Sequence, residues 1–208
     1  MTLIDERYQA KDASLLLLPV LQSAAWPGLA DGARAHVWLG TPVEPSVLVA
    51  YAWLADDETL TYVTADNDPT EHRDDLVKEA FRNLEYYHTD FEVVEAGSGR
   101  MVVSAGWPFA AERVMCENHM LLAHEKLEAE TIVVSIARRG AVIACAANCP
   151  AEVRHTMYSL HAEAWDDPDA VTERVTDELV VFNNGIMTGS TPIVLDDGGR
   201  PVWGPGRG

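Results

Sequence analysis

Short links between apolar, strand-like runs constrain this chain more than any other feature. Runs of this kind occur at residues 34–40, 46–54, 59–64, 91–97, 100–106, 131–137 and 141–147, and most neighbours are separated by only a few residues. Two parallel strands need a crossover of about a dozen residues or more. The short links therefore predict antiparallel hairpins, with turns at Gly97-Ser98-Gly99 and at Arg138-Arg139-Gly140.

Between these hairpins the apolar residues recur at helical spacing. Helices are predicted at residues 13–26, 69–88 and 109–127, and a fourth is predicted to begin near Pro150, since proline is favoured in the first turn of a helix. The second helix carries an apolar stripe that includes Leu76, Ala80 and Leu84. The order predicts an α+β fold, in which antiparallel sheets built from hairpins alternate with helices packed on one face.

The chain is expected to form a single compact domain over residues 1–208. An alternative is a division into two helix–hairpin halves, at about 1–95 and 96–190. Asn184-Gly185 is typical of a tight hairpin turn. Residues 191–208 are rich in Gly and Pro and are predicted to form a loose tail.

The charge balance limits the classes of partner. The sequence has 33 acidic and 15 basic residues and a formal net charge of −18. Such a surface repels phosphates, which argues against binding to nucleic acid or to an anionic membrane. The run Leu15 to Leu21 is too short to cross a bilayer. Three cysteines, an odd and small number, favour a reducing, cytoplasmic location over a disulfide scaffold.

One stretch, Cys116 to Lys126, contains several residues whose side chains can bind a metal ion or take part in catalysis. His119 and His124 are five positions apart and point about 140° apart on a helix, whereas the zinc-protease pattern needs a spacing of four. No metal site and no cofactor are therefore predicted, and the imidazoles are expected to be solvated. The buried stripe of this helix is predicted to comprise Val114, Met115, Leu121 and Leu122, with Asn118 in its middle.

Reactive groups are few. Cys149 lies at the start of the fourth helix, where the helix dipole lowers a thiol pKa, so it is the candidate reactive thiol; the alternative is an incidental residue before Pro150. Asn118, His119 and His155 are the candidates to line a ligand pocket between the two halves. The sequence lacks a nucleophile elbow, a phosphate loop and a dinucleotide fingerprint, so no catalytic residue is assigned and enzyme activity is not indicated.

Residues 46–54 are apolar on both faces of the expected strand, which predicts that a second layer or a second copy covers them. Aromatic residues lie on or near the predicted strands. They indicate either core packing or a surface for a protein partner or for self-association; they are Trp38, Tyr51, Trp53 and Trp107.

The order of these segments over roughly residues 47–187 resembles the YtpQ-like bacterial family of unknown function. The resemblance includes a helix that ends in an Asn-Leu pair, here Asn83-Leu84, followed by a hairpin, a Leu-rich helix and two apolar strands. It ends with a helix and a strand that meets an Asn-Gly turn, here Asn184-Gly185. The family implies a fold and no chemistry. In size, charge and element order the chain is also similar to acidic secretion chaperones.

Two functions follow as hypotheses. The first is a non-catalytic binding or chaperone-like protein that uses its sheet, its acidic surface or both. The alternative is a small-molecule enzyme or ligand sensor, whose pocket lies between the two halves.

Overall fold

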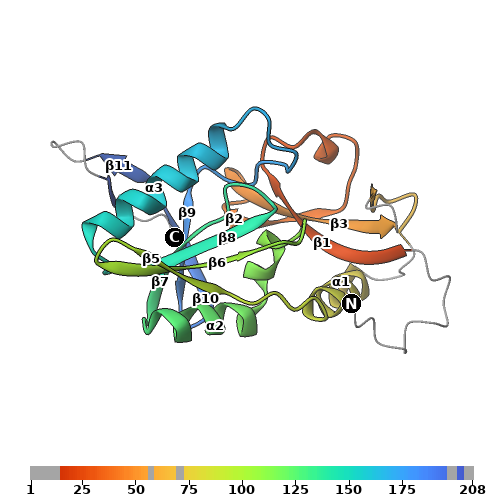
Figure 1. Cartoon of the computed structure of the whole chain (residues 1–208). Coiled ribbons are helices and arrows are strands. Elements are labelled where there is room, and N and C mark those ends of the chain that lie inside the picture. The colour runs from red at the N-terminus through yellow and green to blue at the C-terminus, as the bar shows by residue number, and fades with distance from the viewer. Residues whose placement is uncertain (1–14, 56–58, 69–72, 196–200, 204–208) are drawn as a thin grey trace.

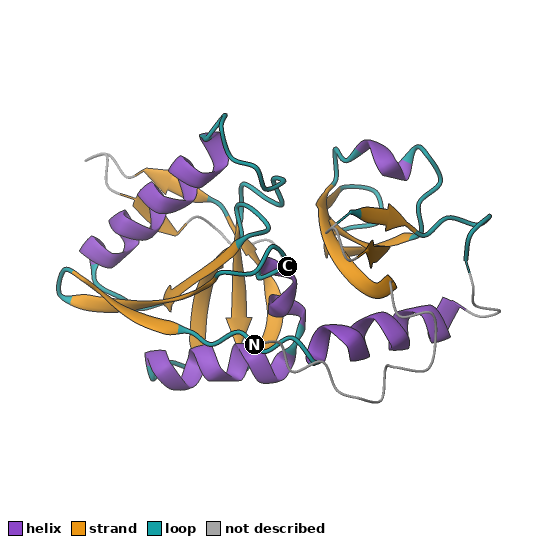
Figure 2. Cartoon of the chain, turned by 45° about the vertical axis from the view of Figure 1, so that its right-hand side comes forward, coloured by secondary structure: helices purple, strands orange, loops and turns teal. Residues whose placement is uncertain are grey.

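The strands form two main antiparallel sheets, and helices pack against both of them (Figures 1 and 2). The computed structural model describes residues 15–55, 59–68, 73–195 and 201–203. Within these residues the predicted α+β class is confirmed, because the strands are antiparallel and alternate with helices.

The first sheet is built around one long central strand, β3 (Pro45–Ala55). One edge of β3 pairs with β1 (Leu15–Ser23) along its whole length. The other edge pairs first with β2 (Ala35–Gly40) and then with β4 (Leu60–Tyr62). A short 3-10 helix, η2 (Pro27–Leu29), follows β1. Helix α1 (Arg73–Glu85) lies along β1 and buries Leu76, Ala80 and Leu84, as predicted.

The prediction of a helix over residues 13–26 is wrong, because Leu15–Ser23 is a strand; residues 13 and 14 lie outside the described residues. Both faces of β1 are buried, with Leu17 and Leu21 on one side and Leu18 and Val20 on the other. An apolar run without alternation looks the same whether it is a buried strand or a buried helix.

Pro19 does not interrupt β1 because it needs no backbone donor at its position. Its partner in the sheet is Tyr51. The N–H of Tyr51 donates to the carbonyl of Arg34 (3.3 Å) and its carbonyl accepts from Val63 (2.8 Å), both on the far side of β3. The proline nitrogen therefore faces the outer edge of the sheet, where a missing N–H is tolerated.

The second sheet has six strands in the order β10-β9-β7-β8-β6-β5. It consists of three hairpins, as predicted for residues 91–106 and 131–147. The strands are β5 (Glu92–Ala96), β6 (Gly99–Ala105), β7 (Thr131–Ser135), β8 (Ala141–Ala146), β9 (Leu179–Asn183) and β10 (Ile186–Thr191). The predicted turn between the last two strands is confirmed, since Asn184 and Gly185 both have positive φ, 48° and 82°.

Helices α2 (Glu117–Leu127) and α3 (Ala151–Asp166) cover opposite faces of this sheet, on either side of the strands in Figure 2. Alternate residues show which face is which: Val102 and Ala144 pack with Met120 of α2, whereas Met101 and Cys145 pack with Met157 of α3. The predicted placement of the helices on one face is therefore wrong for this sheet, because alternate residues of its strands pack against a different helix on each side.

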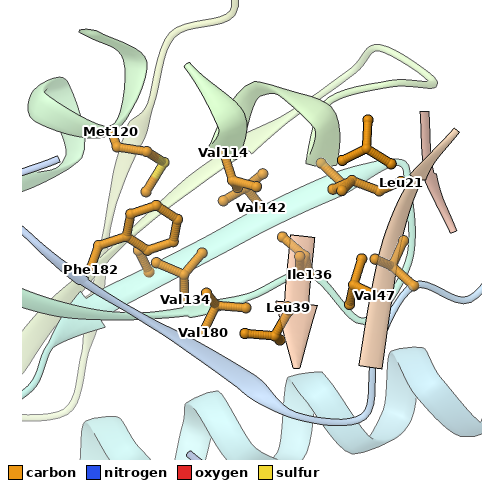
Figure 3. Packing of buried hydrophobic residues seen from close by; sticks show 14 of the residues in the cluster. Leu21, Leu39, Val47, Val114, Met120, Val134, Ile136, Val142, Val180 and Phe182 are labelled. Carbon is orange, nitrogen blue, oxygen red and sulfur yellow. The ribbon is translucent and has the colours of Figure 1, made fainter. Parts of the chain in front are cut away.

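A single buried cluster connects the two sheets. It contains Leu21 and Val47 of the first sheet and Val134, Val180 and Phe182 of the second, and Figure 3 shows these side chains converging. The expectation that both faces of residues 46–54 are covered is met through residue 52: Val47 to Ala52 are all buried, and other segments of the same chain cover them.

Two further segments differ from the prediction. The helix expected over residues 109–127 is split into a 3-10 helix, η3 (Ala111–Met115), and α2. The tail expected to be loose contains β11 (Ile193–Leu195) and β12 (Pro201–Trp203), which pair with each other, and β12 lies beside α3. Residues 196–200 and 204–208 are not among the described residues.

Candidate functional site

The three predicted pocket residues do not converge. Asn118 and His155 are exposed, on α2 and α3 respectively, and these helices lie on opposite faces of the sheet. His119 is only 1% exposed and packs in the interior.

The predicted buried face of α2 is wrong. Leu121 and Leu122 are 40% and 39% exposed, and Met120, Ala123 and Leu127 face the sheet instead. With this rotation the two histidines, which were expected to be solvated, become buried. The spacing of Met120, Ala123 and Leu127 is itself helical, and the small Ala123 allows the helix to approach the sheet closely. This spacing is the feature of the sequence from which the buried face of α2 could have been predicted.

His119 occupies an apolar site. Its ring stacks on Phe91 with centroids 4.4 Å apart, and neither ring nitrogen has a hydrogen-bond partner within the part of the chain that the structure describes. Burial and, to a smaller extent, the nearby Arg113 guanidinium lower the pKa of His119 to about 3. The imidazole is therefore neutral at physiological pH and supplies no charge to a ligand.

A surface groove does lie between the two sheets. It has a volume of about 400 Å³ and is lined mainly by the end of β1, the turn before η2 and the segment that follows α3. Trp26 and Pro27 form an apolar part of its wall. The four charged residues of the lining cancel in formal charge, two basic (Arg138, Arg174) against two acidic (Asp167, Glu173).

The arginine side chains of this groove interact with other groups of the same chain. The Arg138 guanidinium donates to the carbonyl oxygens of Ala164, Trp165, Asp167 and Thr172 at the end of α3. Arg174 lies over the ring of Trp165, with 5.1 Å from its guanidinium carbon to the ring centroid.

Arg139, the second arginine of the β7–β8 turn, connects the two sheets instead. Its guanidinium contacts the carboxylate of Glu112 (Nε–Oε1 3.1 Å), the carboxylate of Glu173 and the carbonyl of Leu21 (3.2 Å). Glu112 is fully buried and also accepts the backbone N–H of Leu21. Burial raises the pKa of Glu112 to about 8, although Arg139 opposes the rise. A buried acid–base pair of this kind can be catalytic, yet Glu112 does not line the groove, so its evident role is to join β1 to the second sheet.

A buried Ser–His pair was not predicted. The hydroxyl of Ser135 on β7 is 2.8 Å from Nδ1 of His161 on α3, and both residues are below 5% exposed. A serine nucleophile must reach a substrate carbonyl, and this one faces the inside of the α3 layer. The pair therefore fastens α3 to the sheet.

The thiols divide into one isolated residue and one pair. Cys116 is buried, and burial raises the pKa of its thiol. Cys149, the predicted reactive thiol, is 6% exposed and its Sγ lies 3.7 Å from that of Cys145. The described residues contain no group of three or more His, Cys, Asp or Glu side chains placed to hold a metal ion.

The outer edge of β5 forms one end of the second sheet. β5 is the terminal strand, and no other described strand pairs with its outer edge. Val93 and Val94 are 47% and 40% exposed on it. Glu92 and Glu95, which flank the two valines, are also exposed.

The aromatic residues predicted on strands belong mainly to the interior. Tyr51 is fully buried, and Trp38 and Trp53 pack against the main core. Trp107 stacks on Tyr87 with centroids 4.2 Å apart. They do not form the exposed patch that one reading of the sequence predicted.

Comparisons of the chain with known protein families, with curated proteins and with solved structures find no match. The YtpQ-like resemblance stays a prediction. Among the described helices, none has both the length and the apolar character needed to span a membrane.

Proposed function

We propose that this protein is a non-catalytic binding protein that receives a basic, extended segment of a partner protein along the outer edge of β5. The observation that carries the proposal is the outer edge of β5, with which no other described strand pairs and which has two exposed valines between two exposed glutamates. A strand edge offers backbone donors and acceptors, and an added peptide strand satisfies them while its side chains select the partner.

Charge selects the class of partner. If two copies paired through β5 about a two-fold axis that passes between Val93 and Val94, Glu92 of one copy would lie opposite Glu95 of the other, and like charges directly opposite in a sheet are destabilising. The same glutamates favour Lys or Arg on an incoming strand. The net charge of −18 attracts a basic segment over a longer range and speeds its encounter.

The arrangement of charged groups supports binding over catalysis. The arginines at the groove are engaged with carbonyl oxygens or an aromatic ring of the same chain, and the Ser–His pair is shielded from solvent. The three free thiols support a reducing, cytoplasmic location as part of this proposal.

A fluorescent Lys–Val peptide with the pattern Lys-Val-Val-Lys, which can place a lysine opposite Glu92 and Glu95 at once, tests the proposal, with a Glu–Val peptide of the same pattern and length as the reference. Fluorescence anisotropy should show binding of the Lys–Val peptide only. The Glu92→Lys/Glu95→Lys variant should weaken that binding by about tenfold or more, which corresponds to about 1.4 kcal/mol.

The matched control is Asp74→Lys/Asp75→Lys, which changes the net charge equally at exposed positions of α1. It should weaken binding far less than the β5 variant. Equal losses in the two variants would mean that the peptide responds to total charge, which contradicts a site at β5.

The groove favours the second candidate function, a ligand sensor for a small molecule. Its volume and its Trp26–Pro27 wall suit a small ligand with an apolar part. Thermal-shift screening of metabolites on the full chain, repeated with Trp26→Ala, tests this function. Stabilisation that Trp26→Ala removes would favour a sensor, and an absence of any stabilisation would count against it.

A further inference from the structure

Cys145 and Cys149 form a close pair of thiols beneath α3. Cys145 is the fifth residue of β8, and Cys149 precedes Pro150, the residue before the first turn of α3. The chain turns between them, and the N–H of Cys149 donates to the carbonyl of Ala146 (3.0 Å). This turn brings the two sulfur atoms to 3.7 Å. In a disulfide the two sulfurs are about 2.05 Å apart, so closure needs them to approach further.

The two thiols differ in their surroundings. A hydrogen bond with the Cys145 thiol and the Arg154 guanidinium lower the pKa of Cys149, and its own backbone N–H acts in the same direction, although burial opposes the shift. Arg154 is held there by a hydrogen bond from its Nη1 to the carbonyl of Cys149 (2.6 Å). The nearby carboxylate of Glu152 points away and accepts the hydroxyl of Ser98 (2.7 Å).

The position of Cys145 suits it to react second, after Cys149 has been oxidised. It is completely buried, whereas Cys149 retains 6% exposure. Burial and the neighbouring Cys149 raise the pKa of the Cys145 thiol, so it stays protonated. A small oxidant reaches Cys149 first, and Cys145 is the only other cysteine within contact distance in the described residues.

We propose that Cys145 and Cys149 are a peroxide-responsive dithiol that closes to an intramolecular disulfide. The Cys149 thiolate attacks one oxygen of hydrogen peroxide, the O–O bond breaks, and the leaving hydroxide takes a proton to become water. The Cys149 sulfenic acid is then attacked by the Cys145 sulfur, and the S–O bond breaks as a second water leaves with the Cys145 proton. Two thiols and one peroxide thus give one disulfide and two waters.

Closing the disulfide brings the two sulfur atoms about 1.7 Å closer together. Both cysteines belong to the apolar cluster that holds α3 on the sheet, together with Val153 and Met157. The inference is independent of the binding site at β5.

Trypsin makes the test direct, because cleavage after Arg139 and Arg154 places both cysteines in one peptide, residues 140–154, while Cys116 falls in residues 114–126. The full chain is treated with limiting hydrogen peroxide, alkylated, digested and analysed by mass spectrometry. The expected product is peptide 140–154, two hydrogens lighter and unalkylated, restored by dithiothreitol. It should form about tenfold faster than any oxidation of Cys116.

Two variants and one control complete the test. In Cys145→Ser, dimedone should trap a sulfenic acid on Cys149, whereas Cys116→Ser should form the disulfide at the wild-type rate. The chain unfolded in urea should form it more slowly than the folded chain. Preferential oxidation of Cys116, or equal rates in the folded and unfolded chains, would overturn the proposal.

Discussion

The side chains of Glu112 and Arg139 form a buried acid–base pair between the two sheets, with 3.1 Å between Oε1 and Nε. Glu112 also accepts the N–H of Leu21, and Arg139 donates to the carbonyl of the same residue. Both backbone groups of one β1 residue are thus bound by side chains that belong to the second half of the chain.

The pair predicts a pH-dependent stability. Burial raises the pKa of Glu112 in the folded protein to about 8, above its ordinary value of 4.5. Between these values the folded state binds more protons than the unfolded state, so this contribution to stability is complete below about pH 4.5 and is lost as the pH rises to 8. Glu112→Gln, which keeps a neutral acceptor, should therefore gain stability relative to wild type by a few kcal/mol between pH 5 and pH 9.

Urea denaturation at pH 5, 7 and 9 measures this difference. Glu125→Gln, at an exposed position of α2, is the matched control and should follow wild type at every pH. A difference between wild type and Glu112→Gln that is constant with pH would contradict the account of Glu112.

The buried His119 predicts a pH dependence of stability that is opposite to the one caused by Glu112. Its pKa in the folded protein is lowered to about 3, so the unfolded state binds more protons as the pH falls below about 6.5, and stability declines towards acid pH. His119→Phe keeps the stack on Phe91 and removes two unpartnered nitrogens. We expect it to stabilise the fold by about 1–3 kcal/mol at pH 7 and by more at pH 5. Thermal unfolding at both pH values checks this, with exposed His155→Phe as control; a destabilised His119→Phe variant would mean that the imidazole is bonded.

The hydrogen bonds of Arg138 predict that replacing it destabilises the segment whose carbonyl oxygens it binds. A lysine at this position cannot reproduce the planar set of donors that now serves four carbonyl oxygens. Arg138→Lys should destabilise the protein by about 1–3 kcal/mol and speed amide exchange in residues 164–172. Exposed Arg82→Lys, on α1, is the control and should change neither quantity appreciably. Unaltered exchange in Arg138→Lys would show that these carbonyls do not depend on it.

Local sequence patterns predicted the hairpins well, because the turn residues and the short links are local constraints. Asn184-Gly185 tolerates the positive φ angles that a two-residue turn needs. β1 was mistaken for a helix because a strand buried on both faces has no alternation to distinguish it. That burial arises from segments distant in sequence.

The site was harder to predict than the fold. His119 was expected to be solvated and was a candidate to line a pocket, whereas its burial follows from how α2 rotates against the sheet. The closeness of Cys145 and Cys149 depends on the turn at Ala146, which the spacing of the two cysteines allows but does not require. The open edge of β5 depends on strand order, a long-range property.

Hydrogen exchange at the amides of β5 tests the binding account most directly. With the Lys–Val peptide at saturation, exchange of residues 92–96 should slow by on the order of tenfold, because the added strand protects their outward N–H groups. β10, the strand at the opposite end of the sheet, should exchange as before. Unchanged exchange in β5, or protection confined to the groove at residues 22–27, would contradict it.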